Sequence, residues 1–226
     1  MLAARYGPFG AIQQLLKLND VVADSKDNHD RTALSHAAGS GYTAGMQLLL
    51  NCGNVAADFR DNSGRTPLSY AAEGGRRTTK GLLKRNDVAA NSRDNSGRTT
   101  LSYAVRNKHW HTMWELLDQG VLVNSRSNSG RTLLPYAAAG GDGCIVQELL
   151  ERDDRIADSC DDSGRTPLPY AAENGHSEAV LVLLARGDCA ADSCDDSGRT
   201  PLSYTAENGH KHVVQDFLVM NENDIM

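Results

Sequence analysis

The sequence has few aromatic residues and no long apolar run. Only 5% of its 226 residues are Phe, Trp or Tyr, so a hydrophobic core must be built mainly from Ala, Leu and Val. No run approaches the roughly 18 apolar residues that a membrane-spanning helix requires. The N-terminus lacks the charged and then apolar pattern of a signal peptide. We therefore expect a cytoplasmic or nuclear protein that is not secreted and has no membrane partner.

Motifs of catalysis and of metal binding are also missing. The five cysteines form no framework of paired spacings, and Cys189 and Cys194 have no nearby histidine to complete a zinc site. No Gly-x-Ser-x-Gly, P-loop, His-Glu-x-x-His or dinucleotide-binding fingerprint occurs. We therefore predict no catalytic residue, no metal ligand and no cofactor, and the balance leans away from an enzyme. A cofactor-independent acid–base enzyme or a small-molecule binder stays open as the alternative, because residues from different segments could meet in one pocket.

What the sequence does contain is a short motif that recurs at a nearly constant interval. Arg-Thr-x-Leu-(Ser/Pro)-(Tyr/His) begins at Arg31, Arg65, Arg98, Arg131, Arg165 and Arg199. The intervals are 34, 33, 33, 34 and 34 residues. Such a period is typical of stacked repeat arrays, in which each repeat buries its apolar face against its neighbours. Proteins of this architecture mostly bind other molecules.

The repeat that begins at Asp161 shows what one interval encodes. Residues 161–164 read Asp-Asp-Ser-Gly, which is a turn signal. Thr166 and Pro167 are suited to the N-cap and the first position of a short helix. Gly175 can end that helix in a left-handed conformation. A second helix is expected over residues 176–185, with its apolar positions on one face.

The pattern Thr-Pro-Leu-x-x-Ala-Ala-x-x-Gly-His, followed by Val/Leu-Leu-Leu, resembles the ankyrin repeat, and it covers essentially the whole chain. Its variant here is similar to the ankyrin arrays of filamentous fungi. The resemblance implies an all-α repeat solenoid of stacked helix-turn-helix pairs with short β-hairpin fingers. It also implies a non-catalytic protein–protein interaction scaffold, which binds its partner through the concave groove formed by the fingers and the first helices.

On this pattern we expect a single domain over residues 1–226. It divides into a partial repeat at 1–26, full repeats at 27–60, 61–93, 94–126, 127–160 and 161–194, and a last repeat at 195–226 that resembles a C-terminal cap.

Charge is distributed unevenly along the chain. Residues 1–141 carry 17 Lys and Arg against 11 Asp and Glu, whereas residues 142–226 carry 6 against 18. Drift between repeats explains this asymmetry, since solvated faces tolerate charge freely. The alternative is a bipolar partner or head-to-tail self-association of copies.

Two series of side chains recur on the predicted groove and are our candidates for partner binding. They are Arg65, Arg98, Arg131, Arg165 and Arg199, with Tyr70, Tyr103, Tyr136, Tyr170 and Tyr204. The structural interpretation, which we favour, is that the arginines pair with the neighbouring finger aspartates and the tyrosines pack between repeats with their hydroxyl groups at the rim. In the latter case the two series stiffen the array.

The fourth repeat departs from the others, because both tryptophans of the protein lie there at helical spacing. Trp110, His111 and Trp114 form a candidate second binding patch. Alternatively, the tryptophans fill the space beside Gly143 and Gly81 of the neighbouring repeats.

The remaining charged and titratable residues suggest no further activity. The basic cluster at Arg76, Arg77, Lys80, Lys84 and Arg85 could bind nucleic acid, but the acidic half of the chain argues against such binding. His176 and His210 occupy the Gly-His position of the ankyrin pattern, where the resemblance implies a hydrogen bond to neighbouring backbone. A protein of unknown identity is therefore the partner we expect.

Overall fold

The computed structural model describes residues 4, 9–17, 22–52, 55–75, 77–152, 157–186 and 191–223. Two compact units are present, Met1–Leu122 and Val123–Met226. Within the described residues the secondary structure is helical, apart from two isolated antiparallel bridges, Lys26–Thr32 and Arg93–Thr99. Arg76 and Cys189, both named above, lie outside the described residues. The partition into seven repeats stays a prediction.

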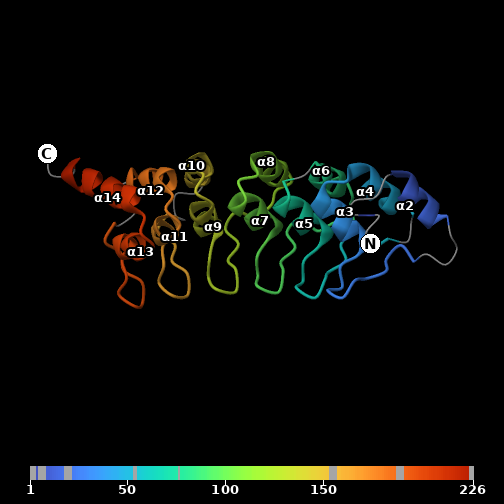
Figure 1. Cartoon of the computed structure of the whole chain (residues 1–226), viewed down its shortest axis with the longest axis horizontal. Helices are drawn as coiled ribbons and strands as arrows, with labels where there is room; N and C mark the ends of the chain where they lie inside the picture. Colours follow the sequence, from blue (N-terminus) through green and yellow to red (C-terminus); the bar gives the residue numbers. More distant parts are fainter. Residues whose placement is uncertain are drawn as a thin grey trace. The chain divides into compact units, whose positions relative to one another are not determined.

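Each compact unit contains two rows of helices (Figure 1). The first helices of the repeats form an inner row, which is α3 (Ala33–Ser40), α5 (Pro67–Glu73) and α7 (Thr100–Arg106) in the N-terminal unit, and α9 (Leu133–Gly140), α11 (Pro167–Glu173) and α13 (Pro201–Glu207) in the C-terminal unit. The second helices form an outer row, which is α2 (Phe9–Leu16), α4 (Thr43–Leu50), α6 (Thr78–Leu83) and α8 (Trp110–Asp118), followed by α10 (Gly143–Arg152), α12 (Ser177–Leu184) and α14 (Lys211–Asn223). The fingers project from the inner row, away from the outer helices.

A threonine at the N-cap starts each inner helix. In four repeats its hydroxyl group accepts a hydrogen bond from the backbone N–H three residues later, as between Thr66 and Ser69. Thr166 is an N-cap as predicted but lacks this bond, because Pro169 has no N–H to donate. Its hydroxyl group lies 3.4 Å from Oγ of Ser193 instead. In the fifth repeat Pro135 likewise has no N–H, and the hydroxyl group of Thr132 lies 2.9 Å from Oγ of Ser159.

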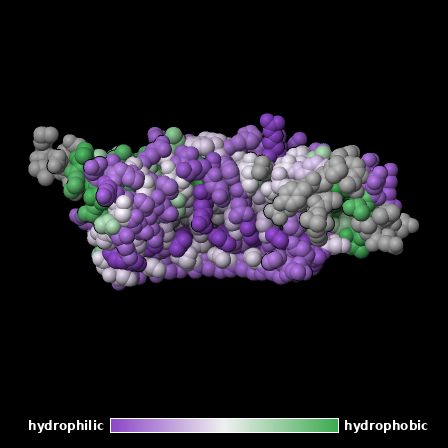
Figure 2. Space-filling model, in the orientation of Figure 1, coloured by the Kyte–Doolittle hydropathy of each residue, from purple (hydrophilic) through white to green (hydrophobic). Residues whose placement is uncertain are grey.

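Small and branched apolar side chains fill the space between neighbouring inner helices. The leucine of the recurring motif is 1% exposed or less at Leu34, Leu68, Leu101, Leu134 and Leu168, and the alanines one turn later are equally buried. Alanine allows the helices to approach closely. In the last described repeat the equivalent Leu202 is 40% exposed, and Figure 2 shows an apolar patch over α14 nearby.

The fingers are tight turns closed by backbone hydrogen bonds. In the sixth repeat the N–H of Asp161 donates to the carbonyl oxygen of Arg165 at 3.0 Å, and Gly164 has φ +74°. Glycine adopts this left-handed conformation without steric cost. In the second repeat Asp30 occupies the same position with φ +60°, which aspartate tolerates better than most residues do.

Neighbouring finger tips are joined by one backbone hydrogen bond each. In the N-terminal unit the N–H of Asn62 donates to the carbonyl oxygen of His29 at 3.0 Å, and that of Asn95 donates to Ser63 at 2.9 Å. Two bonds of the same kind join the C-terminal tips, from Asp162 to Ser129 and from Asp196 to Ser163, both at 3.1 Å. These main-chain bonds therefore help to set the spacing of the tips, together with a bond from Nδ2 of Asn95 to the carbonyl oxygen of Asn62 at 2.9 Å.

A histidine and a glycine lock the turns between inner and outer helices. Nε2 of His210 donates to the carbonyl oxygen of Glu173 in the preceding repeat at 2.9 Å, and the ring lies against Gly175. His176 makes the equivalent bond to the carbonyl oxygen of Ala139 at 3.1 Å. The prediction that His176 and His210 bind neighbouring backbone is confirmed. His109 makes the same contact with Glu73 and Gly75.

Candidate functional site

Every finger except the one that begins at Ser127 is tied to its inner helix by a single carboxylate. In the sixth repeat Oδ1 of Asp161 accepts the backbone N–H groups of Ser163 and Arg165, both at 3.0 Å. Its Oδ2 accepts the hydroxyl group of Tyr170. The same aspartate–tyrosine hydrogen bond measures 2.5 Å for Asp61–Tyr70, 2.7 Å for Asp94–Tyr103 and 2.5 Å for Asp195–Tyr204. In the second repeat His36 replaces the tyrosine and bonds Asp27 at 2.9 Å.

Two arginines stack between the tyrosines of consecutive repeats. The guanidinium carbon of Arg65 lies 3.9 Å from the ring centre of Tyr70 and 4.4 Å from that of Tyr103. Arg165 lies 4.1 Å from Tyr170 and 4.3 Å from Tyr204. Cations are attracted to aromatic faces at these distances.

These two arginines also form ion pairs with a glutamate at the end of their own inner helix. The distances are 2.6 Å for Arg65–Glu73 and 2.5 Å for Arg165–Glu173. Both guanidinium groups are mostly buried.

The other arginines of the series pair with finger aspartates. Arg98 and Arg199 pair with the aspartate of their own finger, at 2.8 Å and 3.2 Å. Arg131 reaches the next finger, where its Nε lies 3.5 Å from Oδ2 of Asp161. The predicted pairing with finger aspartates is therefore present for Arg98, Arg131 and Arg199, whereas Arg65 and Arg165 pair with glutamates instead.

Burial separates the candidate residues into two groups. Tyr103, Tyr136, Tyr170 and Tyr204 are buried and Tyr70 is half-buried, so the rings offer little area to a partner. The guanidinium groups of Arg98, Arg131 and Arg199 keep about a third to a half of their surface. The arrangement presents cations on the finger side and places the tyrosines underneath as supports. Figure 2 shows that side as predominantly hydrophilic.

The tryptophan patch lies on the outer row of the N-terminal unit, on α8. Trp114 is 36% exposed and Trp110 is half-buried. His111 is 79% exposed, with its Nε2 3.3 Å from Oε1 of Glu115. A Cβ built on Gly81 would meet only Cε of Met46, at 2.6 Å. The interpretation that Trp114 fills the space at Gly81 is therefore wrong, because Met46 fills it.

Cations surround this patch. Arg77, Lys80 and Lys84 are exposed on or beside α6, which packs against α8, and Arg106 and Lys108 are exposed just before α8. The exposed side chains of α6 and α8 therefore combine positive charge with an indole ring.

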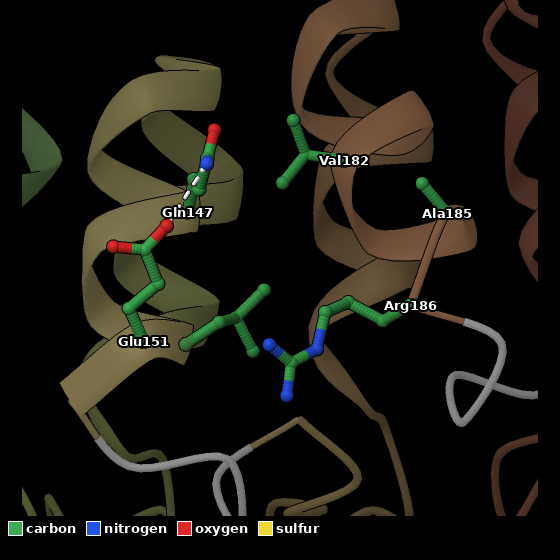
Figure 3. Close-up of a pocket in the computed structure, with 6 residues that line it drawn as sticks. Gln147, Glu151, Val182, Ala185 and Arg186 are labelled. Carbon is green, nitrogen blue, oxygen red and sulfur yellow. Dashed lines mark hydrogen bonds between the residues drawn. The ribbon is translucent and has the colours of Figure 1, made fainter.

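A shallow pocket of about 270 Å³ lies between α10 and α12 in the C-terminal unit (Figure 3). Its lining is Gln147, Leu150, Glu151, Val182, Ala185 and Arg186. Nε2 of Gln147 donates to Oε1 of Glu151 at 2.9 Å. The lining contains no serine, cysteine, histidine or tyrosine, and its charged side chains are those of Glu151 and Arg186. Nor do the described residues contain a cluster of three side chains that could hold a metal ion.

Comparison with protein-family models gives a match over the whole chain. The family described as ankyrin repeats (3 copies) matches residues 1–92, 78–156 and 136–226. The chain belongs to the ankyrin-repeat family. No curated protein matches the sequence.

Ankyrin repeats are generally protein–protein interaction modules, and this chain has their all-helical repeat architecture. None of the helices in the described ranges is long and apolar enough to cross a membrane.

The hydrogen bonds at the base of several ankyrin fingers shift the pKa values of the groups involved. The hydroxyl group of Tyr204, the N–H of Arg199 and its guanidinium group lower the pKa of Asp195 to about 2. Burial would raise the pKa of Asp94, but the hydrogen bonds from Tyr103 and Arg98 outweigh it and lower that pKa. Burial and the bond to Asp61 raise the pKa of Tyr70 to about 12.

We expect these carboxylates to make the protein acid-sensitive. A carboxylate whose pKa is lower in the folded state stabilises the fold above its unfolded value of about 3.9, and this contribution is lost as the pH falls through the folded value. The free energy of unfolding should therefore fall between about pH 4 and pH 2. Denaturant titrations at several pH values measure this.

The variant Tyr204→Phe provides the control for this assignment. Removing the hydroxyl group should raise the pKa of Asp195, as measured by NMR titration of the carboxyl carbon, and should leave that of Asp94 unchanged. An unchanged pKa for Asp195 would show that the tyrosine is not its main partner.

A second series of arginines, which was not predicted from the sequence, lies at the fingers. Nη1 of Arg126 donates to the carbonyl oxygens of Gly130 at 2.7 Å and of Cys160 at 2.9 Å, which joins two consecutive fingers. Arg60 makes the equivalent pair of bonds in the N-terminal unit. The signal was present in the sequence, because an arginine immediately precedes three successive fingers, at Arg60, Arg93 and Arg126.

Proposed function

We propose that this ankyrin-repeat protein is a non-catalytic interaction scaffold that binds a partner protein on its finger side. Arg98, Arg131 and Arg199 make the polar contacts, and the buried tyrosines hold the row in position. The exposed guanidinium groups, each placed by contact with a tyrosine ring, are the observation that carries the proposal. Arginine fixed in this way loses little side-chain entropy when it binds a carboxylate.

The tyrosines and the two stacked arginines contribute indirectly. Arg65 and Arg165 are engaged by rings and glutamates, so they stiffen the row rather than bind the partner. A stiff row suits recognition because less conformational entropy is lost on association.

Site-specific photo-crosslinking tests the proposal. A photoreactive residue at Ser129, which is exposed at a finger tip, is expected to form a covalent adduct with the partner. The same probe at Gln147, which is exposed on the outer helix α10, is the matched control. Adducts from the outer probe alone would overturn binding on the finger side.

We propose Trp110, His111 and Trp114 as a second contact with the partner. An exposed indole beside several cations is a composition that interfaces favour. The patch lies on the outer row, so a partner that uses both surfaces must be large or must bind in two parts.

Replacing Trp114 by alanine is expected to weaken partner binding by about tenfold or more. The free energy of unfolding should fall by only about 1–2 kcal/mol, because a third of the side chain is already exposed. Titration calorimetry and denaturant unfolding give the two values. The neighbouring Met113 is fully buried, and Met113→Ala should show the opposite pattern, with a stability loss of about 3 kcal/mol. A comparable stability loss in Trp114→Ala would assign that residue to packing.

A further inference from the structure

The fifth repeat lacks the carboxylate that ties finger to helix in the other full repeats. Aspartate occupies this position at Asp27, Asp61, Asp94, Asp161 and Asp195. Each of these carboxylates accepts a hydrogen bond from the tyrosine or histidine nine residues later. In the fifth repeat the position is Ser127, and the side chain nine residues later is Tyr136.

Ser127 makes only some of the hydrogen bonds that the aspartate makes in the other repeats. Its Oγ accepts the backbone N–H of Arg131 at 3.2 Å and lies 3.1 Å from Oγ of Ser129. The finger is therefore closed as in the other repeats. A serine side chain is smaller than that of aspartate by one carbon and one oxygen, so it has no second oxygen atom to accept the hydroxyl group of Tyr136.

Tyr136 has no hydrogen-bond acceptor among the described residues. Its side chain is only 7% exposed, yet within the described part of the chain no hydrogen bond involves its hydroxyl group, and that group is not sealed from solvent. The hydroxyl group of Tyr170, one repeat on, is bonded to Asp161. The fifth repeat therefore differs from the others in that the hydroxyl group of its tyrosine makes no hydrogen bond to the described residues.

Arg131 also lacks its usual close carboxylate. The other arginines of the series lie 2.5–3.2 Å from a carboxylate oxygen. The guanidinium carbon of Arg131 lies 4.7 Å from the ring centre of Tyr170. The closest carboxylate oxygen in the described ranges is Oδ2 of Asp161, 3.5 Å from Nε of Arg131. Its Nε makes no hydrogen bond to any described residue, and the side chain is 37% exposed.

We propose that the space beside Ser127 is a binding site for a carboxylate from the partner protein, that is, an aspartate or glutamate side chain. The incoming carboxylate takes the place that the Asp Oδ2 atom occupies in the other repeats. It accepts the hydroxyl hydrogen of Tyr136, and Arg131 supplies the positive charge. A carboxylate that accepts hydrogen bonds beside a guanidinium group forms a strong charge-assisted contact.

The charge of Asp161 does not prevent this binding. That carboxylate already accepts the hydroxyl group of Tyr170 and two backbone N–H groups. Burial would raise the pKa of Asp161, but these donors and the charge of Arg131 stabilise the anion and lower that pKa. The claim that the carboxylate comes from a partner protein rests on the proposed function. The claim that this position binds a carboxylate does not.

Acetate, used as the probe, tests the site without any partner. In ¹H–¹⁵N NMR spectra of the full chain, the amide signals of Ser129 and Arg131 are expected to shift saturably at millimolar acetate. The equivalent signals of Ser163 and Arg165 should stay unchanged, because Asp161 fills their site. Shifts of equal size in all repeats, or no saturation, would overturn the proposal.

Three variants sharpen this test. Ser127→Asp restores the missing carboxylate and should abolish the acetate response. Asp195→Ser removes the carboxylate from the seventh repeat and should create a response at the amides of Ser197 and Arg199. If the amides of the fifth repeat still respond to acetate in Ser127→Asp, the proposed site is wrong. Tyr136→Phe should weaken acetate binding, because it removes only the hydroxyl group that donates the hydrogen bond.

The source of the carboxylate is tested with the captured partner. Ser127→Asp is expected to reduce partner affinity by about tenfold. If the partner binds the variant unchanged while acetate binding is lost, the ligand is a free carboxylate anion and the assignment to the partner is wrong. Failure of the proposed function is separate, since it would show as adducts from the outer helix with the acetate response intact.

Discussion

Replacing Leu168 by alanine is expected to lower the free energy of unfolding by about 3 kcal/mol. Leu168 is 1% exposed on α11, where it packs between the inner helices on either side. Truncation leaves a cavity, and the close-packed alanines around it cannot collapse into the space. Urea unfolding followed by circular dichroism measures the change.

Leu202→Ala is the matched control for this prediction. Leu202 holds the same position of the motif in the last repeat and has the same preceding residues, Asp-Asp-Ser-Gly-Arg-Thr-Pro. It is 40% exposed, so the expected loss is only about 1 kcal/mol. Equal losses for the two variants would show that Leu202 is covered in solution and that the last inner helix is not an open end.

Replacing Gly175 by alanine is the second large effect that we expect, with a loss of about 3 kcal/mol or more. Gly175 has φ +71°, a conformation that costs alanine about 1 kcal/mol. The new Cβ would also lie 2.5 Å from Nδ1 of His210. The ring must move, and its hydrogen bond to the carbonyl oxygen of Glu173 is then lost. Thermal unfolding measures the combined effect.

Gly209→Ala separates the two causes. Gly209 has φ +72°, but a Cβ at this position would meet no described atom within 4 Å, so only the backbone cost of about 1 kcal/mol remains. In the background of His210→Ala, the substitution Gly175→Ala should likewise cost only about 1 kcal/mol more. A full additional loss in that background would show that the histidine ring is not the obstacle.

Much of the fold could be predicted because one repeat is encoded locally and then copied. The threonine N-cap, the proline after it and the glycine that ends the helix predicted α11 to within a residue, and the second helix, expected at 176–185, is α12 at Ser177–Leu184. The sequence did not predict that the hydroxyl group of Thr166 lies against Ser193 instead of accepting a backbone N–H. The sequence shows a proline at position 169, but its consequence depends on Ser193, which comes close only in the folded chain.

The candidate site was less predictable for the same physical reason. The spacing of Arg131 and Tyr136 placed both on the finger side, but it could not show which way a guanidinium group turns. That direction depends on carboxylates contributed by other repeats, such as Asp161 for Arg131. The substitution of serine at position 127 was visible in the sequence, and its importance became clear only when the aspartate–tyrosine bond was seen in the other repeats.

The backbone bonds between finger tips have a consequence for protein engineering. Because the bond from Asp162 to Ser129 uses only main-chain atoms, replacing the side chains at Ser129 and Ser163 leaves the backbone bonds between the finger tips in place, and at Ser129 it removes only the contact with Oγ of Ser127. New recognition residues could be grafted there by randomising the tip serines. A combinatorial library built in this way would sample binding specificities on an unchanged framework.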